Sequence, residues 1–377
     1  MSKIIIAADI CPTDSNEYLF ENGNVHELIG QELQDIIGDA DFRIYNLEGP
    51  VIEHQSPIIK CGPNLGISPK TMNGICALQP SFLTLANNHI MDHGVDGLEN
   101  TIKQLDCCNI AYGGVGNNIS EAKKENIFEI DGSLVGIYCC AEHEYSIATE
   151  ENAGANPYDP LESFDDVATL KEKCDIVIVL FHGGKEYYRY PSPNLQRIFR
   201  KFAEKGADVV VAQHTHCIGA FEKYNDSYLV YGQGNFIFDG GDDEFWNTGM
   251  LISLKLFQGK IDKVEFILYE KNNGGKIQYL SGEKRVEIMS SFRKRSEEIL
   301  DTVFVKNMFS NYAKEHINDY LNYVHGDNLL YKLLRKVMGT KIAAFMYSSP
   351  YGLNMLLNHV ECEAHNEMLV NGIKSIH

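Results

Sequence analysis

The feature of this sequence that most limits its fold is a regular alternation of short apolar runs with longer segments of helical period. The runs are rich in β-branched and aromatic residues and span 3–8, 42–47, 82–86, 134–140, 175–181, 208–212 and 228–231. Between them, apolar residues recur at the spacing of one helix face over 26–37, 97–105, 164–173 and 194–205. This order of strand, helix and strand predicts α/β layers.

Two more apolar runs, 250–256 and 263–269, follow 228–231 without a helical segment between them. Strands joined in this way usually pair antiparallel, so we expect an antiparallel end to the sheet rather than a purely doubly wound one. The helix over 97–105 is predicted to begin just after Asp96, because Asp96 and Glu99 have the spacing of a helix cap.

The chain changes character near residue 280. Glycine and proline concentrate before this point, and the rest of the chain has helical period over 283–304, 308–324, 329–338 and around 353–370. We therefore predict an α/β domain over 1–280 and a helical C-terminal segment over 281–377. The stripe of Leu330, Leu333, Leu334 and Val337 must be covered by the first domain or by another chain.

The charge balance excludes some classes of partner. Lys and Arg number 33 against 52 Asp and Glu, a formal net charge of −19, which argues against binding to nucleic acid. The first apolar run meets Asp9 too soon for a secretory signal, and no apolar stretch is long enough for a transmembrane segment. Ten cysteines without Cys-x-x-Cys spacing fit reduced thiols, so a cytoplasmic location is expected.

Polar residues of the types that bind metals follow the apolar runs. These residues are Asp9, Asn46 and Glu48, Asn87 to His89, His182, and His214 with His216. The carboxyl ends of parallel strands meet at one edge of a sheet, so these residues can converge in space. Each of them singly is better explained by a turn or a helix cap. The five together indicate a metal site.

Several stretches, taken in order and spacing, resemble one family. They are Asn46-Leu47-Glu48, Leu85-Ala86-Asn87-Asn88-His89, His182-Gly183-Gly184-Lys185-Glu186-Tyr187, His214-Thr215-His216 and Tyr231-Gly232-Gln233-Gly234-Asn235-Phe236. The family is that of the poly-gamma-glutamate capsule biosynthesis protein CapA, which has the fold of the calcineurin-like metallophosphoesterases. The resemblance covers about residues 3–270 and leaves the helical tail outside.

The resemblance implies a four-layer αββα sandwich with two divalent metal ions, which would be Mn, Zn, Fe or Mg. Its implied ligands are Asp9, Glu48 and His216 for one ion, and Glu48, Asn88, His182 and His214 for the other. His89 would then protonate the leaving oxygen. Asp92 is suited to orient that imidazole, although a turn residue before the next helix is an equally good interpretation of Asp92.

Other polar residues are candidates for contacts with an anionic substrate. Lys185, Glu186 and Arg189 follow His182, and Lys60 lies in the loop 56–63. Glu186 is also a candidate to hydrogen-bond a metal-ligating histidine. A solvated loop is the alternative for Lys185, Glu186 and Arg189, and Lys60 is the weaker candidate of the four. Metallophosphoesterases usually begin with Asp-x-His, but Cys11 stands here in the place of that histidine. Its thiolate is a candidate ligand, and a buried structural thiol is the alternative that we favour.

The function that these residues and the resemblance imply is a metal-dependent hydrolase of the phosphoesterase type. It would act on an anionic small molecule or polymer in bacterial capsule or envelope polymer biosynthesis. The C-terminal helices would then contact a second copy of the chain or a polymer-synthesis partner. The alternative is a non-catalytic subunit that binds or scaffolds an anionic polymer or its synthase, because a fold does not by itself fix a function.

Overall fold

The structure is a computed structural model, and it describes residues 2–241, 243–271, 275–324, 329–339, 342 and 350–375. It divides into two compact units, Met1–Val305 and Lys306–His377. This division falls beyond the boundary near 280 that the composition predicts. Helix α10 (Gly282–Glu298) belongs to the first unit, because its Phe292 packs on Phe266 with ring centroids 5.0 Å apart.

The first sheet has eight strands. Its order is β16 (Ile277–Tyr279), β15 (Lys260–Lys271), β14 (Thr248–Phe257), β1 (Ser2–Cys11), β2 (Phe42–Leu47), β3 (Phe82–Thr84) and β4 (Ala111–Gly113), with β13 (Ile237–Phe238) beside β1. Strands β1 to β4 pair in parallel, whereas β14, β15 and β16 are antiparallel to their neighbours. The expected antiparallel end of the sheet is therefore present.

The second sheet has six strands. Its order is β11 (Phe221–Tyr224), β12 (Ser227–Val230), β10 (Val209–Gln213), β9 (Ile176–His182), β7 (Ser133–Ala141) and β6 (Asn126–Ile130). Strand β12 joins this sheet in parallel to β10, so it is not part of the antiparallel run that follows it in the chain. Strands β5 (Val115–Gly116) and β8 (Gly154–Ala155) form a small separate pair.

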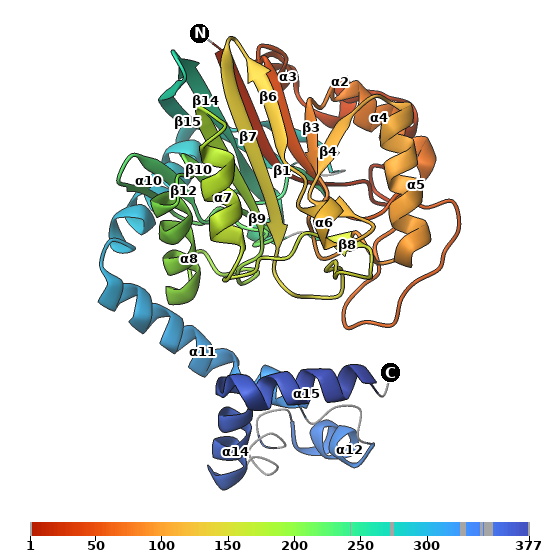
Figure 1. The fold of residues 1–377 in the computed structure, drawn as a ribbon, viewed down its shortest axis with the longest axis vertical. Helices are drawn as coiled ribbons and strands as arrows, with labels where there is room; N and C mark the ends of the chain where they lie inside the picture. The colour runs from red at the N-terminus through yellow and green to blue at the C-terminus, as the bar shows by residue number, and fades with distance from the viewer. Residues whose placement is uncertain are drawn as a thin grey trace. The chain divides into compact units, whose positions relative to one another are not determined.

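Alternation along β9 shows how the layers stack. Ile176, Ile178 and Leu180 belong to the core cluster that includes the first sheet, whereas Val177, Val179 and Phe181 pack in a second cluster with helices. Those helices are α7 (Ser163–Lys171) and α8 (Pro193–Glu204). Figure 1 shows them on one side of the sheets and α3, α4 and α5 on the other. The layer order is helix, sheet, sheet, helix, so the predicted αββα sandwich is confirmed.

The remaining helices of the first unit are short or lie at its edges. They are α1 (Glu17–Glu21), α2 (Val25–Leu28), α3 (Gln31–Gly38), the 3₁₀ turn η1 (Pro69–Thr71), α4 (Met72–Ala77), α5 (Gly94–Cys107), α6 (Ile119–Ala122) and α9 (Glu244–Asn247). The helix predicted over 26–37 is two helices, because Gly30 between them donates its N–H to the Ile277 carbonyl at 2.8 Å. Helix α5 begins before Asp96, which lies in its first turn.

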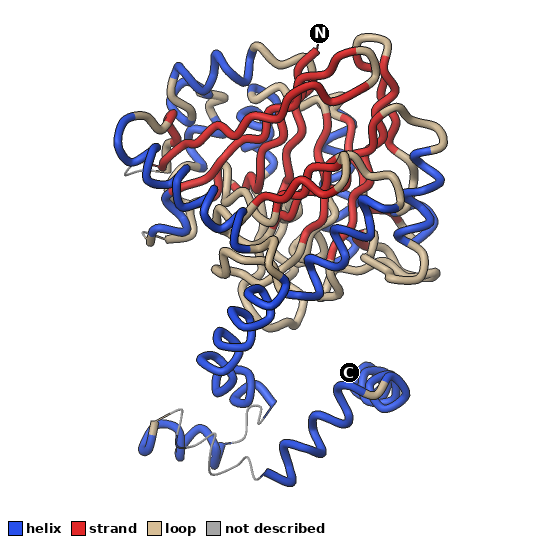
Figure 2. Tube along the Cα trace, turned by 90° about the vertical axis from the view of Figure 1, so that its left-hand side faces the viewer, coloured by secondary structure: helices blue, strands red, loops and turns tan. Residues whose placement is uncertain are grey.

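Figure 2 shows that the chain after β16 is helical. The single helix predicted over 283–304 is interrupted, because α10 ends at Glu298 and α11 (Thr302–Val324) begins at Thr302. The Asp301 side chain precedes α11 and accepts a hydrogen bond from the Val303 N–H at 2.8 Å. The second unit also contains α12 (Leu329–Met338), α14 (Pro350–Glu361) and α15 (Glu363–Ser375). Among the residues that the structure describes, no helix combines the length and the apolar content needed to cross a membrane.

Candidate metal centre

The register of the parallel strands brings the polar strand ends together. Asp9 on β1 is opposite Asn46 on β2, and the Asn46 side-chain amide donates to Asp9 Oδ1 at 2.7 Å. In the second sheet His182 is opposite Gln213, which immediately precedes His214. The His214 N–H donates to Asp9 Oδ2 at 3.4 Å and so connects the two sheets. The carboxyl ends of strands from both sheets thus meet at one site, as the sequence predicts.

Glu48 lies at the centre of this site and is 0% exposed. Neither of its carboxylate oxygens has a hydrogen-bond partner among the described residues. Burial raises the pKa of Glu48 well above its ordinary value, and the nearby carboxylates, Asp9 first, raise it further. Buried polar atoms are nearly always paired, so a carboxylate with two unpaired oxygens fits a cation site.

Two histidines face this carboxylate. Ligand atoms of Glu48, His214 and His216 all lie within 4.8 Å of one another. Burial lowers the pKa of His214 to about 3, with the His216 imidazole as the next cause. Neutral imidazoles of this kind are the form that binds divalent metals. His214 and His216 also have φ angles of 84° and 53°, in the left-handed region, and such strain tends to cluster at functional sites.

His182 and Asn88 extend the cluster on its other side. His182 Nε2 lies 3.0 Å from the side-chain oxygen of Asn88, and its ring centroid is 4.9 Å from that of His214. Burial lowers the pKa of His182 well below its ordinary value, and the His214 imidazole lowers it further. The Asn88 amide nitrogen donates to Glu144 Oε2 at 3.0 Å, which fixes the direction of its oxygen.

His89 and Asp92 lie together beside the cluster. His89 Nδ1 is 2.6 Å from Asp92 Oδ2, and His89 Nε2 is 4.0 Å from Glu48 Oε1. Asp92 is fully buried and also accepts a hydrogen bond from the Leu65 N–H at 2.6 Å. The structure therefore places Asp92 against the imidazole of His89 as well as in a turn of the chain, so the two interpretations of Asp92 are compatible.

Lys60 is paired inside the protein, beside His89 and Asp92. Its side chain is 2% exposed and its ammonium forms an ion pair with Asp92. The same Nζ lies 3.1 Å from His89 Nδ1. Lys60, on the long loop before η1, thus places a buried positive charge beside His89 and Asp92. This position depends on the path of the loop, which the spacing of the sequence does not define.

The three other candidates for substrate contacts lie on the loop after β9. Glu186 Oε1 is 3.8 Å from His214 Nε2 and 3.9 Å from His216 Nε2. Lys185 lies near enough to contribute to the low pKa of His214, after burial and the neighbouring imidazoles. Arg189 is already engaged, because it donates to the Ile218 carbonyl and to Glu244 Oε1 at 3.1 Å each. Glu186 is the one that lies directly against the histidines.

The sequence reasoning missed two residues that contact His216. The side-chain oxygen of Asn235 lies 2.8 Å from His216 Nδ1, and the Trp246 ring stacks on the imidazole at a centroid distance of 4.7 Å. Asn235 is part of the stretch Tyr231 to Phe236 that carries the resemblance, but no role was predicted for it. For Trp246, being the single tryptophan of the chain was the only signal.

Cys11 is buried at the end of β1. Burial raises the pKa of its thiol well above the ordinary value, and the carboxylates of Glu48 and Asp9 raise it further. A thiol in these surroundings stays protonated, and its Sγ lies 3.8 Å from the Pro12 carbonyl oxygen. These surroundings favour the structural interpretation of Cys11.

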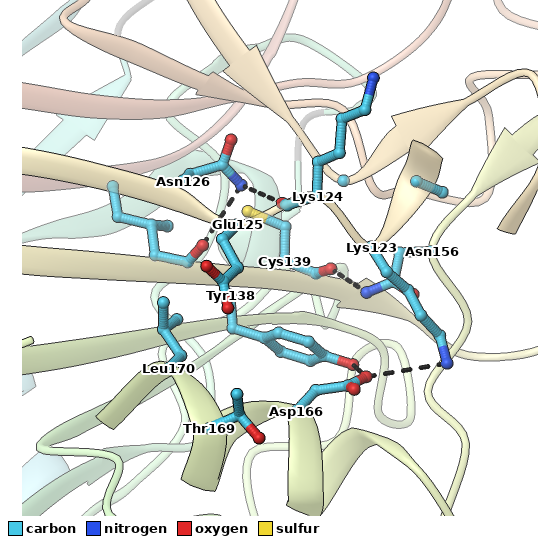
Figure 3. Close-up of a pocket in the computed structure, with 13 residues that line it drawn as sticks. Lys123, Lys124, Glu125, Asn126, Tyr138, Cys139, Asn156, Asp166, Thr169 and Leu170 are labelled. Atoms are coloured by element: carbon cyan, nitrogen blue, oxygen red, sulfur yellow. Dashed lines mark hydrogen bonds and ion pairs between the residues drawn. The ribbon is translucent and has the colours of Figure 1, made fainter. Parts of the chain in front are cut away.

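A small pocket elsewhere in the first unit is not the candidate site. It has a volume of about 100 Å³, and Figure 3 shows Tyr138, Asp166 and Lys123 on its wall. Tyr138 donates to Asp166 Oδ2 at 3.3 Å, and Lys123 Nζ lies 3.7 Å from the same atom. None of the predicted metal ligands lines this pocket.

Comparison with other proteins agrees with the geometry. Residues 3–240 match the family described as bacterial capsule synthesis protein PGA_cap. The capsule biosynthesis protein CapA of Bacillus anthracis is 28% identical over 224 residues, which cover 57% of this chain and 54% of that protein. The PGA biosynthesis protein CapA of Bacillus subtilis (strain 168) is 28% identical over 218 residues, covering 56% of this chain and 57% of that protein.

The chain thus spans just over half the length of these two relatives. Among solved structures, a putative 5′-nucleotidase from Staphylococcus aureus aligns with 78% of this chain and 58% of its own, at 16% identity and a TM-score of 0.44. The family assignment rests on the sequence match, which includes the strand ends that supply the candidate ligands. The chain belongs to the bacterial capsule synthesis protein family PGA_cap.

Proposed function

We propose that this protein is a metal-dependent hydrolase of the phosphoesterase type that acts in the biosynthesis of a capsule or envelope polymer. The observation that carries the proposal is the buried Glu48 carboxylate, with two unpaired oxygens and two buried imidazoles beside it. An unpaired buried charge is costly, and a bound cation removes that cost. The names of the two Bacillus relatives support a role in making the polymer.

The donor set fits divalent ions. Carboxylate, imidazole and amide oxygen donors are available together, which suits Mn, Zn, Fe or Mg. We propose that two ions are held, one by Asp9, Glu48 and His216 and the other by Glu48, Asn88, His182 and His214. When bound, a pair of divalent ions polarises a phosphoryl oxygen and lowers the pKa of a water molecule.

His89 is the proposed proton donor to the leaving oxygen. Asp92 accepts the hydrogen bond of His89 Nδ1, which leaves Nε2 on the side of Glu48 and the metal ligands. Lys60 pairs with Asp92 and so holds that carboxylate in its place. Lys60 is therefore proposed as a positioning residue for His89 and not as a substrate contact.

The loop after β9 is the proposed contact for the substrate. Glu186 lies against both histidines, and Lys185 and Arg189 supply positive charge in a chain whose net charge is strongly negative. An anionic substrate, either a small molecule or a polymer, meets favourable charge at this loop and repulsion over much of the remaining surface.

One observation favours a second candidate, a non-catalytic subunit that binds the polymer or its synthase. Cys11 stands where an imidazole ligand of the first metal is usual, and its surroundings keep its thiol protonated. A site with one donor fewer can bind metal and still lack hydrolytic activity.

Turnover of generic substrates separates the two candidates. The protein is supplied in turn with Mn²⁺, Zn²⁺, Fe²⁺ and Mg²⁺, and hydrolysis of bis-p-nitrophenyl phosphate, p-nitrophenyl phosphate and a γ-glutamyl peptide is followed. If the protein is a hydrolase, turnover requires the metal and is lost in the Glu48→Gln variant. Bound metal with no turnover of any of these substrates would instead favour the binding subunit.

A further inference from the structure

A buried arginine in the first unit lacks a carboxylate partner. Arg295 on α10 is 9% exposed, and its guanidinium donates to the carbonyls of Gly219 at 2.8 Å and Ile218 at 3.1 Å. Among the described residues, no carboxylate forms an ion pair with it. Glu298, one turn further along the helix, acts on the charge of Arg295 without forming an ion pair, and it accepts a hydrogen bond from the Tyr190 hydroxyl at 2.7 Å. Buried charges are normally paired, so a guanidinium that donates to carbonyls and to no carboxylate of the described residues is suited to bind an anion.

A second guanidinium lies beside the first. Arg189 donates to the same Ile218 carbonyl at 3.1 Å, so the two donor nitrogens are at most 6.2 Å apart. Burial lowers the pKa of Arg295 to about 10, and the charge of Arg189 is the next cause. The ion pair of Arg189 with Glu244 compensates little, because the Glu244 side chain is 74% exposed. Two positively charged guanidiniums therefore share the Ile218 carbonyl as an acceptor.

Arg189 and Arg295 both line one cavity of about 500 Å³ between α9 and α10. Lys284 also lines the cavity, but it is exposed and forms an ion pair with Glu270 at 2.6 Å. The acidic residues of the wall, Glu244 and Glu287, are exposed to solvent as well. The volume is ample for a carboxylate or a phosphoryl group with part of the molecule that carries it. The planar donors of arginine suit either group.

The cavity shares a wall with the candidate metal centre. Helix α9 contributes Glu244 and Asn247 to the cavity, and its Trp246 stacks on His216. Arg189 lies over the Phe245 ring at 4.7 Å, and that ring packs against Tyr187, the neighbour of Glu186 in the chain. A molecule with several anionic groups can therefore place one at the cavity while another lies near the metal ligands.

We propose that the cavity between α9 and α10 is an anion site in which Arg295 and Arg189 bind a carboxylate or phosphoryl group. Two sources supply such a group: a free small anion, or a second acidic group of the substrate of the metal centre. The second source rests on the proposed function, whereas the anion site itself does not.

Calorimetric titration of the full-length, metal-free protein with inorganic phosphate and with glutarate tests the site. Emission of Trp246, the only tryptophan, reports binding next to α9. We expect saturable binding that Arg295→Gln weakens at least about tenfold, the loss of one charge-assisted contact. The matched control is Arg293→Gln, because Arg293 is exposed on the same helix and does not line this cavity. It is expected to bind as the wild type does.

Arg189→Gln provides an independent variant in case Arg295→Gln fails to fold, and it is also expected to weaken binding about tenfold. Absence of saturable binding to the folded wild type would overturn the proposal. So would equal affinity in the wild type and in whichever of the two arginine variants folds.

A tri-glutamate peptide distinguishes the two sources of the anion. If the substrate spans both sites, the peptide binds more tightly than glutarate to the metal-loaded protein and equally to the metal-free protein. If the site instead binds a free small anion, the peptide binds no more tightly than glutarate to either the metal-loaded or the metal-free protein. Failure of the metal-dependent gain therefore counts against the substrate link alone, and failure of metal-free binding counts against the anion site.

Discussion

The side-chain oxygen of Asn235 lies 2.8 Å from Nδ1 of His216, and the same imidazole has its Nε2 3.9 Å from Glu186. An acceptor at Nδ1 keeps the proton on that nitrogen and leaves the lone pair of Nε2 free for a metal. Asn235 is thus placed to set both the tautomer and the ring orientation of a proposed ligand.

We expect Asn235→Ala to weaken divalent metal binding by about 10–100-fold, the usual scale for loss of a group that orients a ligand. Asn235→Asp, which keeps the acceptor, should retain most of the affinity. Competition with a chromogenic chelator measures both variants. Equal affinity in Asn235→Ala and the wild type would show that this contact does not orient the ligand.

Glu48→Gln should not destabilise the metal-free protein at neutral pH, although Glu48 is fully buried. The raised pKa of Glu48 means that folding disfavours its charged form, and the amide removes that charge. We expect the variant to melt about 2 °C higher than the metal-free wild type, because a gain of roughly 1 kcal/mol in the free energy of unfolding shifts the melting temperature of a chain of this size by that amount. Divalent ions should raise the melting temperature of the wild type only. A lower melting temperature for the metal-free variant contradicts this account.

The metal-free protein should lose stability as the pH falls below about 6.5, because His214 and His182 are neutral when buried. The folded pKa of His214 is about 3 against 6.5 in the unfolded chain, so the unfolded state binds more protons between these values. Stability from this residue is therefore complete above pH 6.5 and declines toward pH 3.

Urea unfolding at pH 7.5, 6.5 and 5.5 measures this decline. The His214→Asn variant is the control, because it removes the group that must take up the proton. Its loss of stability between pH 6.5 and 5.5 should be smaller than that of the wild type, by up to about 1.4 kcal/mol. The same loss in both proteins would assign the pH dependence to other groups.

His89→Asn should leave metal content nearly unchanged and lower hydrolytic turnover by about a hundredfold or more. His89 is within hydrogen-bond distance of Asp92, but its Nε2 is 4.0 Å from Glu48, at the edge of the cluster. Metal analysis and steady-state turnover on the same preparation test the two halves of this prediction. Loss of metal would make His89 a ligand, and unaltered turnover would remove it from the mechanism.

The strand ends explain how much of the site the sequence predicted. A residue near the end of a buried strand is positioned by the pairing of that strand, so Asp9 and Asn46 lie opposite each other where β1 and β2 pair. The register shift between Ile6 and Asp9 that brings them opposite does not follow from the sequence pattern. Residues on irregular segments carry no such information. Lys60 reaches His89 from a long loop, and Trp246 reaches His216 from a short helix, and neither position follows from a spacing.

The fold shows the same limit at the end of the first unit. The helical period after residue 280 was identified correctly, but periodicity does not tell which surface a helix covers. Phe292 and Arg295 make α10 part of the first unit through contacts with Phe266 and with the carbonyls of Ile218 and Gly219. These partners are distant in sequence, so composition alone does not indicate them.

Metal content of the folded protein, purified without chelator and supplied with divalent ions, tests the central claim most directly. We predict about two divalent ions per chain in the wild type, since two cations are proposed to share Glu48. The Glu48→Gln variant should lose them while remaining folded by circular dichroism. A folded wild type that binds no divalent ion, or a Glu48→Gln variant with the full wild-type content, would contradict the assignment of this cluster as a metal centre.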